Sequence, residues 1–454
     1  MISIKRSIIV IAVSLMAAAG SWAARIQVSP GSLAADPDAV AAIADGELIL
    51  EGAASAADLA TLRSLSGEVT SVDISSLTLP SNQIPANMLF GTNVRTVKLN
   101  PATTSIGDHA FAATMIEEMV LPAAIEKVGD YAFSGCPALT NFTFASSPEL
   151  GKAIFSGDEA LTSVTFGANT SQIPDKTFEG CTSLDMTLPE SIETIGATAF
   201  RRSGLRMVDL RHIKSIGDFA FAEMPRLTGI IYAVENSPKL GKGVFFANPV
   251  LAAIPALPAD IPALVMAHTG ARGTITVYAR EVGEAAYANN PQITQVNLMP
   301  GVTNIKAHAF RNDTGISNVN VSELEENVPE IDTDAFSGLE NADGNYDIAL
   351  RVLKGTENAW KQHPVWSRFN LDIVSYIDSA ITENASLRAW RDGDAIIVKA
   401  NAPMELVEVF SISGARLYER RNAGESIAIP GVAADEIAMV RAVVGTTVSV
   451  VKLM

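Results

Sequence analysis

A short pattern of apolar positions recurs through the middle of the chain, in which an aliphatic residue is followed five positions later by an aromatic one. The clearest copies span residues 106–111, 128–133, 150–155, 195–200 and 216–221. We call the aromatic residue, or the apolar residue that replaces it, the anchor. Twelve anchors follow one another at intervals of 21 to 26 residues, a period typical of solenoid repeats. They stand at positions 89, 111, 133, 155, 178, 200, 221, 245, 266, 287, 310 and 336.

A second apolar pattern begins five or six residues after each anchor. In Leu139, Phe142 and Phe144, and again in Leu161, Val164 and Phe166, the last positions alternate with polar ones. Such alternation predicts a short, half-buried strand. One unit of strand, turn and anchor cannot bury its apolar side alone, so stacking of neighbouring units is required. The sequence therefore predicts a repeat solenoid of about 12 coils of about 22 residues.

The two patterns resemble the BspA-like, Treponema-type leucine-rich repeats found on bacterial surfaces, and the resemblance covers about residues 84–340. It implies an exported, adhesin-like protein. No asparagine recurs after the strand, so we expect no asparagine ladder. Within residues 246–290 the repeat is degenerate, because Ala- and Pro-rich sequence at 251–262 replaces a clean strand pattern. We expect a kink or an irregular coil there.

The N-terminus has the pattern of an export signal. Lys5 and Arg6 precede an almost wholly apolar stretch at 7–20, and small residues flank Trp22, which predicts a signal peptide at 1–23 with cleavage after Ala23. A buried N-terminal helix is the alternative. Residues 24–83 alternate strand-like and helix-like stretches and resemble the N-terminal cap of BspA-like proteins from Bacteroidota.

The repeat period ends before residue 379. The solenoid is expected to occupy residues 84–378, closed by the segment 352–374 with Trp360 and Trp366. Short alternating stretches separated by glycine turns predict an antiparallel β-sandwich at 379–454. The stretch that begins at Val407 resembles a type A sorting domain of the type IX secretion system. Glu436-Ile437-Ala438 replaces that family's usual Gly-Ile-Tyr, and an accessory sandwich without sorting function is the alternative.

Charge narrows the classes of partner. The chain has 454 residues, with 33 basic and 50 acidic side chains and a net charge of −17. Removal of the signal peptide, which carries two bases and no acid, leaves a net charge of −19. This excess of acid argues against binding nucleic acid or anionic lipid. No second apolar run approaches the ~18 residues of a transmembrane helix, so no membrane span is expected in the mature protein.

Known catalytic and metal-binding motifs do not occur in the sequence. The five histidines have no H-E-x-x-H spacing, and there is no G-x-S-x-G, P-loop or G-x-G-x-x-G motif. His109 and His308 both lie two residues before an anchor, so their likeness reflects the repeat. We therefore expect a protein that is not an enzyme, with no catalytic residue, cofactor or metal.

Two further sets of residues carry groups that can bind a metal or react. The first is an acidic stretch between residues 323 and 334, which has the oxygen ligands that calcium needs but lacks EF-hand spacing, so a solvated acidic face is the favoured interpretation. Cys136 and Cys181 each follow an anchor by three residues. Because two coils separate them by roughly 10 Å, no disulfide is expected, and both are predicted to be buried thiols. The acidic stretch comprises Glu323, Glu325, Glu326, Glu330, Asp332 and Asp334.

The outward positions of the strands are the remaining candidate surface. In a solenoid they align across coils into a broad, rigid face suited to a protein ligand, such as host extracellular matrix or another bacterial surface protein. A cell-surface or secreted location is expected, with the periplasm as the alternative place and an envelope scaffold as the alternative role. The candidate binding residues are Lys98, Thr143, Thr165, Asp209, Ile231, Asn297 and Asn320, to which Val120 also belongs by position.

Overall fold

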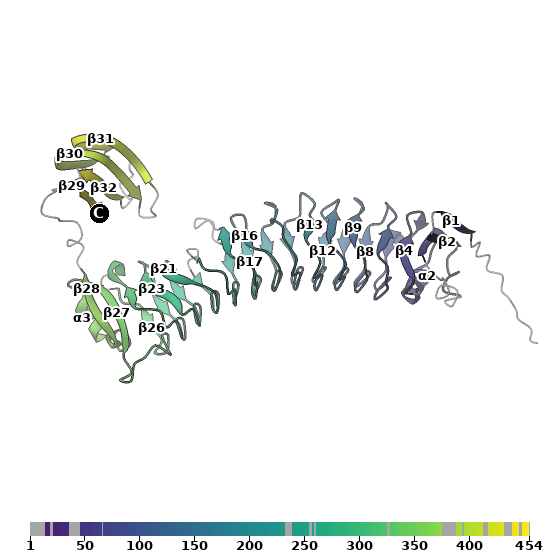
Figure 1. The fold of residues 1–454 in the computed structure, drawn as a ribbon, viewed down its shortest axis with the longest axis horizontal. Coiled ribbons are helices and arrows are strands. Elements are labelled where there is room, and N and C mark those ends of the chain that lie inside the picture. Colours follow the sequence, from purple (N-terminus) through teal and green to yellow (C-terminus); the bar gives the residue numbers. More distant parts are fainter. Residues whose placement is uncertain are drawn as a thin grey trace, which may run out of the picture. The chain divides into compact units, whose positions relative to one another are not determined.

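A computed structural model describes most of the chain in thirteen stretches. The chain divides into two units, of which the first contains residues up to Leu350 and Gln362–Asn370, and the second contains Arg351–Lys361 and Leu371–Met454. Elements within the first unit form stacked coils (Figure 1). The residues described are 14–18, 21–35, 46–65, 67–231, 238–253, 257, 260–324, 327–374, 387–392, 395–411, 416–430, 438–444 and 447–453.

Most coils carry one strand on each of two faces, as the alternating pattern predicts, although the coil between β13 and β16 has no strand on the long-strand face. The long-strand face bears β7 (Thr96–Lys98), β9 (Glu118–Leu121), β11 (Asn141–Phe144), β13 (Ser163–Thr165), β16 (Met207–Asp209), β18 (Gly229–Ile231), β21 (Arg272–Val277), β23 (Gln292–Leu298), β25 (Asn318–Asn320), β27 (Tyr346–Leu353) and β28 (Phe369–Val374). Neighbouring coils pair in parallel, as β9, β11 and β13 do.

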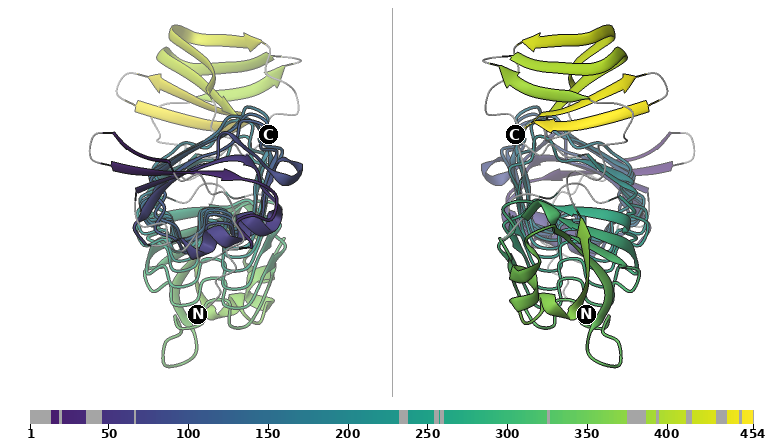
Figure 2. Two further views of the ribbon diagram at one scale, coloured as in Figure 1. Left: turned by 90° about the vertical axis from the view of Figure 1, so that its right-hand side faces the viewer. Right: turned by 90° about the vertical axis from the view of Figure 1, so that its left-hand side faces the viewer.

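The short-strand face bears two-residue strands that end on the aliphatic residue before each anchor. They are β6 (Gln83–Ile84), β8 (Ser105–Ile106), β10 (Lys127–Val128), β12 (Glu149–Leu150), β14 (Gln172–Ile173), β15 (Thr194–Ile195), β17 (Ser215–Ile216), β19 (Lys239–Leu240), β20 (Asp260–Ile261), β22 (Glu281–Val282), β24 (Asn304–Ile305) and β26 (Glu330–Ile331). Viewed along the array, the blue and teal coils overlap, and the later, green coils lie displaced to one side of them (Figure 2).

The anchors form the core between the two faces. Phe111, Phe133, Phe178 and Phe200 are fully buried. Successive rings stack, with centroids 5.1 Å apart between Phe111 and Phe133 and between Phe178 and Phe200. The predicted column of anchors, and with it the repeat solenoid, is confirmed.

The turn around each anchor is set by its backbone. The residues two before and two after the anchor have positive φ in nearly every coil, including His109 (φ 55°) and His308 (φ 59°). The glycine four before the anchor allows close stacking, since a Cβ on Gly151 would lie 2.6 Å from the Asp130 nitrogen of the preceding coil. The segment is a tight turn, and the position of the two histidines follows the repeat.

Residues 24–83 continue the parallel sheet of the repeats. β1 (Ser14–Ala18) pairs antiparallel with β2 (Ser21–Val28), and then β2, β3 (Gly46–Ala53), β4 (Val69–Asp73) and β7 pair in parallel. The β3–β4 connection contains α2 (Ala56–Thr61) and the 3-10 turn η1 (Leu62–Ser64), in the expected alternation of strand and helix. The solenoid accordingly has about 14 turns, two more than the anchors indicate. Smaller elements are β5 (Leu77–Thr78) and η2 (Pro80–Asn82).

The degenerate repeat interrupts one face only. Among the described residues between β18 and β21, no strand occupies the long-strand face. The anchor turns continue across the same coils, because the Phe245 N–H donates to the Val265 carbonyl (3.0 Å) and the Met266 N–H donates to the Ala286 carbonyl (2.8 Å). Three prolines in the sequence at 255, 258 and 262 lack the N–H that a sheet ladder needs.

The predicted closing segment buries its tryptophans. It contains α3 (Glu357–Gln362) and η5 (Trp366–Arg368), while η4 (Ser322–Leu324) precedes it. Trp360 and Trp366 are fully buried. The Trp366 indole N–H donates to the Pro329 carbonyl (3.0 Å), and its ring lies 6.5 Å from the last anchor, Phe336. These contacts cover the apolar end of the anchor column.

The C-terminal region is antiparallel, as predicted, but its strands form one curved sheet, a half-barrel, in place of the two layers of a sandwich. The sheet contains β29 (Arg388–Asp392), β30 (Ala395–Ser411), β31 (Arg416–Pro430), β32 (Ala438–Val444) and β33 (Thr447–Leu453). The expected short stretches are joined in one place, because residues 395–411 form the single long strand β30. Its first part pairs with β29 and its second with β32, so the sheet curls around its own core of Val398, Val407 and Val440.

Candidate functional site

The structure aligns most of the candidate binding residues in register on the long-strand face. Thr143 of β11 lies between Val120 of β9 and Thr165 of β13. Asp209 of β16 pairs with Ile231 of β18. Asn297 of β23 pairs with Asn320 of β25. The candidates therefore form three groups, one in each of three separate sheets of this face.

Lys98 stands apart from these groups because its charge is already paired. Its ammonium lies 3.2 Å from Glu47 and 3.3 Å from Asp73, on strands β3 and β4. The hydrogen bonds to Glu47 and Asp73 raise the pKa of Lys98. Sequence spacing could not reveal this pairing, since Glu47 is 51 residues away. Lys98 therefore offers a partner little free charge.

The long-strand face also exposes apolar side chains. Val120 is 68% exposed, Met207 56% and Ile231 39%. Val120 and Ile231 were expected to point outward, whereas Met207 was not among the expected residues. Its position two residues before the outward-pointing Asp209 is the feature of the sequence that indicates its exposure. Exposed aliphatic side chains on paired strands suit contact with protein.

Around Asn297 this face is polar and rich in amides. Within β23, the Gln295 amide donates to the side-chain oxygen of Asn297 (2.7 Å), and the Asn297 amide lies 3.4 Å from the hydroxyl of Thr276 on the neighbouring strand β21. Asp209, by contrast, accepts from Arg211 (3.0 Å), and this hydrogen bond lowers the pKa of Asp209. The face thus changes character along the array, from aliphatic and hydroxyl groups to amides.

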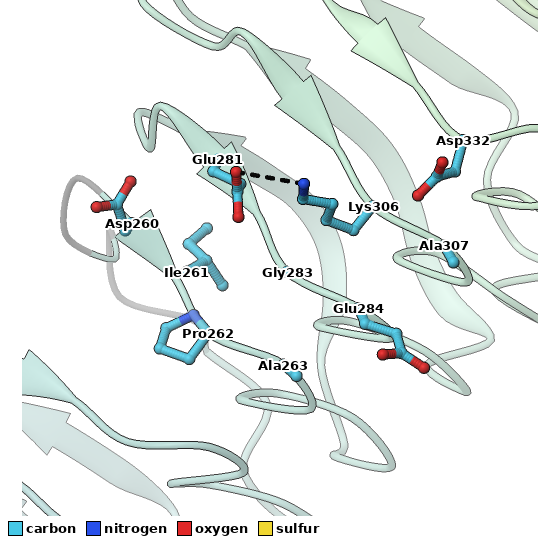
Figure 3. A pocket seen from close by; sticks show the side chains of 10 residues that line it. All are labelled: Asp260, Ile261, Pro262, Ala263, Glu281, Gly283, Glu284, Lys306, Ala307 and Asp332. Carbon is cyan, nitrogen blue, oxygen red and sulfur yellow. Dashed lines mark ion pairs between the residues drawn. The ribbon is translucent and has the colours of Figure 1, made fainter.

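A hollow of about 410 Å³ lies on the short-strand face between β20 and β26. Figure 3 shows acidic side chains around it, with Lys306 paired to Glu281 at 3.5 Å. Among all residues that the structure describes, no group of three or more His, Cys, Asp or Glu side chains is placed to hold a metal ion. Of the acidic stretch considered for calcium, Glu325 and Glu326 lie outside the described residues. The carboxylates around the hollow are Asp260, Glu281, Glu284 and Asp332.

Both cysteines are free and buried, as predicted. Burial raises the pKa of the Cys136 thiol to about 12, and burial also raises that of Cys181. Neither thiol is therefore a ready nucleophile near neutral pH. Within the described part of the chain, no helix is long and apolar enough to cross a membrane.

The residues three positions after each anchor form a buried column that the apolar pattern did not reveal. We call these residues the rungs. Asn248 is a representative rung, because its amide donates to the carbonyls of Phe221 and Phe245 (both 2.9 Å) and its oxygen accepts from the Met224 N–H (2.7 Å). No single residue type occupies all of the rungs, and asparagine stands at only two of those that are buried, Asn248 and Asn290. The signal was the small or polar residue at this offset. The buried rungs are Thr92, Thr114, Cys136, Asp158, Cys181, Ser203, Met224, Asn248, Thr269, Asn290 and Asp313.

Parallel coils with stacked anchors and a hydrogen-bonded buried column define a leucine-rich repeat solenoid. The chain belongs to the BspA type leucine rich repeat family, whose model matches residues 69–185, 148–255 and 274–359, more than half of the chain. Leucine-rich repeats are a non-enzymatic kind of fold, and proteins built from them generally bind proteins.

Solved structures are similar to the chain, and the first of the following shows the same fold. A leucine-rich repeat protein from Bacteroides ovatus is 18% identical, with a TM-score of 0.58 over 79% of this chain and 90% of that one. A leucine rich cell surface protein from Faecalibacterium prausnitzii is 16% identical, with a TM-score of 0.38 over 67% of this chain and 92% of the other. The pneumococcal vaccine antigen PcpA is also 16% identical, with a TM-score of 0.43 over 68% and 79%. No curated protein matches the chain.

Proposed function

We propose that the protein is a non-catalytic cell-surface protein that binds a protein ligand, adhesin-like, through the long-strand face. The observation that carries this proposal is the exposure of three aliphatic side chains on the long-strand face, Val120 in the sheet of β9, and Met207 and Ile231 in the sheet of β16 and β18. Exposed apolar groups favour a protein over a glycan, which is bound more often by hydroxyl, amide and aromatic groups. The export-signal pattern of residues 1–23 agrees with a ligand outside the cell.

Binding to immobilised basement-membrane matrix by purified residues 24–454 tests the proposal. We expect the pair Thr143→Arg and Thr165→Arg to weaken binding at least tenfold, because one long cation would stand beside Val120 and a second would stand on the next strand. The pair Asn297→Arg and Asn320→Arg tests the amide end of the same face.

The matched control is the pair Gln83→Arg and Gln172→Arg, which adds the same charge on the short-strand face, where both glutamines are exposed. Equal loss in the control and the face variants would contradict binding through the long-strand face. Absence of any binding to matrix by the unchanged protein would contradict a host-matrix ligand.

We also propose export, with cleavage after Ala23. Cleavage would remove β1 and the first residues of β2, and the parallel pairing of Ala24 to Val28 with β3 would remain. Protease shaving of intact cells should remove the solenoid. Protection from the protease would place the protein in the periplasm and favour the envelope scaffold.

The C-terminal sheet is proposed to act as a type A sorting domain. An antiparallel sheet with its own buried core, including Ile396, Val409 and Ile429, supports an independently recognised module. Deletion of residues 387–454 should leave the protein in the periplasm. Surface display of the truncated protein would show that the sheet is an accessory module. Glu436 and Ile437, where the sorting pattern departs, lie outside the described residues.

A further inference from the structure

Two of the rungs are aspartates that stand where asparagines stand in other coils. Asn290 shows the full pattern of an amide rung: its oxygen accepts from the Thr269 N–H (2.9 Å), and its nitrogen donates to the carbonyls of Met266 (2.9 Å) and Tyr287. Asn248 makes the same three contacts in its own coil. An amide rung therefore uses one oxygen as acceptor and one nitrogen as a donor to two anchor carbonyls.

Asp158 and Asp313 reproduce only the acceptor half of this pattern. Asp158 Oδ1 accepts from the Cys136 N–H and Asp313 Oδ1 from the Asn290 N–H, both at 2.7 Å. The second oxygen of each carboxyl, Oδ2, is buried without a hydrogen-bond partner. Equivalence of the coils puts this oxygen in the slot where asparagine places its donor, facing carbonyl oxygens. A charged carboxylate would be repelled there, whereas an O–H would donate.

Asp58 shows what a buried ionised carboxylate looks like in the same chain. Its two oxygens accept from the N–H groups of Gly31, Leu33, Ala34 and Ser55 and from the Ser55 hydroxyl, at 2.7–2.9 Å. Burial alone would raise the pKa of Asp58, but these hydrogen bonds lower it. Neither Asp158 nor Asp313 has such a set of donors.

We propose that Asp158 and Asp313 are neutral carboxylic acids in the folded protein, whose Oδ2–H groups donate to anchor carbonyls, so that the array opens locally at these two rungs when they lose their protons. The groups facing Asp158 from the adjoining coils are the thiols of Cys136 and Cys181. Asp313 faces the uncharged rung Asn290, and no described basic residue pairs with either carboxyl.

The direction of the pH effect follows from linkage. Burial raises the pKa of Asp313 to about 8 and that of Asp158 well above its ordinary value. The folded state therefore holds a proton that the unfolded state has lost above pH ~4. Stability falls as pH rises through this window, by up to about tenfold in the opening equilibrium per pH unit for each acid. Asparagine at the same position has no such dependence.

The native cysteines provide a local readout, because Cys136 and Cys181 are buried on either side of Asp158 and react only when the coils open. The experiment compares thiol labelling of the folded full chain with that of Asp158→Asn from pH 6 to pH 8. At a given pH the exposed thiols of the opened coils react equally fast in both proteins. The ratio of the two labelling rates therefore measures how the residue at position 158 changes the opening equilibrium. We expect the ratio of wild type to variant to rise about tenfold per pH unit. Asp313→Asn, five or more coils away from both thiols, should leave the wild-type pH dependence unchanged.

A ratio that stays constant with pH would overturn the proposal, as would faster labelling of Asp158→Asn at every pH. Failure of Asp158→Asn to fold would also overturn it, since Asn248 and Asn290 occupy the same slot in this chain. The reverse variant Asn248→Asp should introduce a new pH-dependent opening. It can be followed by hydrogen exchange of the Met224 N–H, which donates to the side-chain oxygen of residue 248. A ratio of variant to wild-type exchange rate that stays constant between pH 6 and pH 8 would contradict the proposed chemistry of the slot, because the intrinsic base-catalysed exchange is the same in both proteins.

Discussion

At the scale of single residues, two positions of each repeat are constrained by contacts with the neighbouring coil. The glycine four residues before an anchor has no room for a side chain, and the rung three residues after it must satisfy buried carbonyls. Both requirements come from the stacking distance of the coils. They explain why a glycine and a small polar residue recur although neither is part of the apolar pattern.

Gly151→Ala should destabilise the array by about 1–3 kcal/mol, the usual cost of overpacking. Its Cβ would lie 2.6 Å from the backbone of both Gly129 and Asp130, which cannot move independently. Gly229→Ala is the matched control, because its Cβ would meet only the flexible end of Met207, at 3.3 Å. Urea unfolding of the two variants measures the difference. Equal stability would show that the coils can separate without cost.

At the scale of elements, the strands are too short to be stable alone, and the anchors join them. Two-residue strands such as β8 and β10 pair with each other through only two residues each. The ring column behind them supplies the apolar burial that isolated hairpins of this length lack. The C-terminal sheet solves the same problem differently, with the seventeen-residue strand β30 shared by its neighbours.

Phe155→Ala should cost about 3–5 kcal/mol, as is typical for a buried aromatic side chain. Phe155 is fully buried, with ring centroids 4.7 Å from Phe142 and 5.6 Å from Phe178. Phe90→Ala is the control, because Phe90 is 45% exposed and its truncation should change stability by about 0.5 kcal/mol or less. Thermal and urea unfolding would measure both variants. A small effect at Phe155 would mean that neighbouring rings refill the space.

At the scale of the whole molecule, the C-terminal sheet and the coils around the two acidic rungs should respond to pH in opposite directions. In the C-terminal sheet, hydrogen bonds from Arg441 and Arg416 lower the pKa of Glu408. A lowered folded pKa gives stability that is present above the unfolded value, about 4.5, and is lost as pH falls through the folded one. The raised pKa values of Asp158 and Asp313 give stability that is lost as pH rises.

Hydrogen exchange resolved along the chain should therefore show the C-terminal sheet opening first in acid and the coils around the two acidic rungs opening first in mild alkali. Glu408→Gln should remove the acid sensitivity of the sheet and leave that of the solenoid unchanged. Simultaneous opening of both units at one pH would contradict the separate assignments.

The sequence by itself determined the period, the anchors, the solenoid class and the outward positions of the strands. The apolar pattern can be recognised within a single unit and repeats about every 22 residues. A coil in which the pattern is weak can therefore be assigned from the spacing of its neighbours. The pairing of Lys98 with Glu47, the union of two predicted strands in β30 and the exposure of Met207 were decided only by the tertiary structure. So were the rungs, because an aspartate between two cysteines becomes a buried acid only when neighbouring coils remove it from water. Contacts between coils depend on the stacking distance, which no single repeat records.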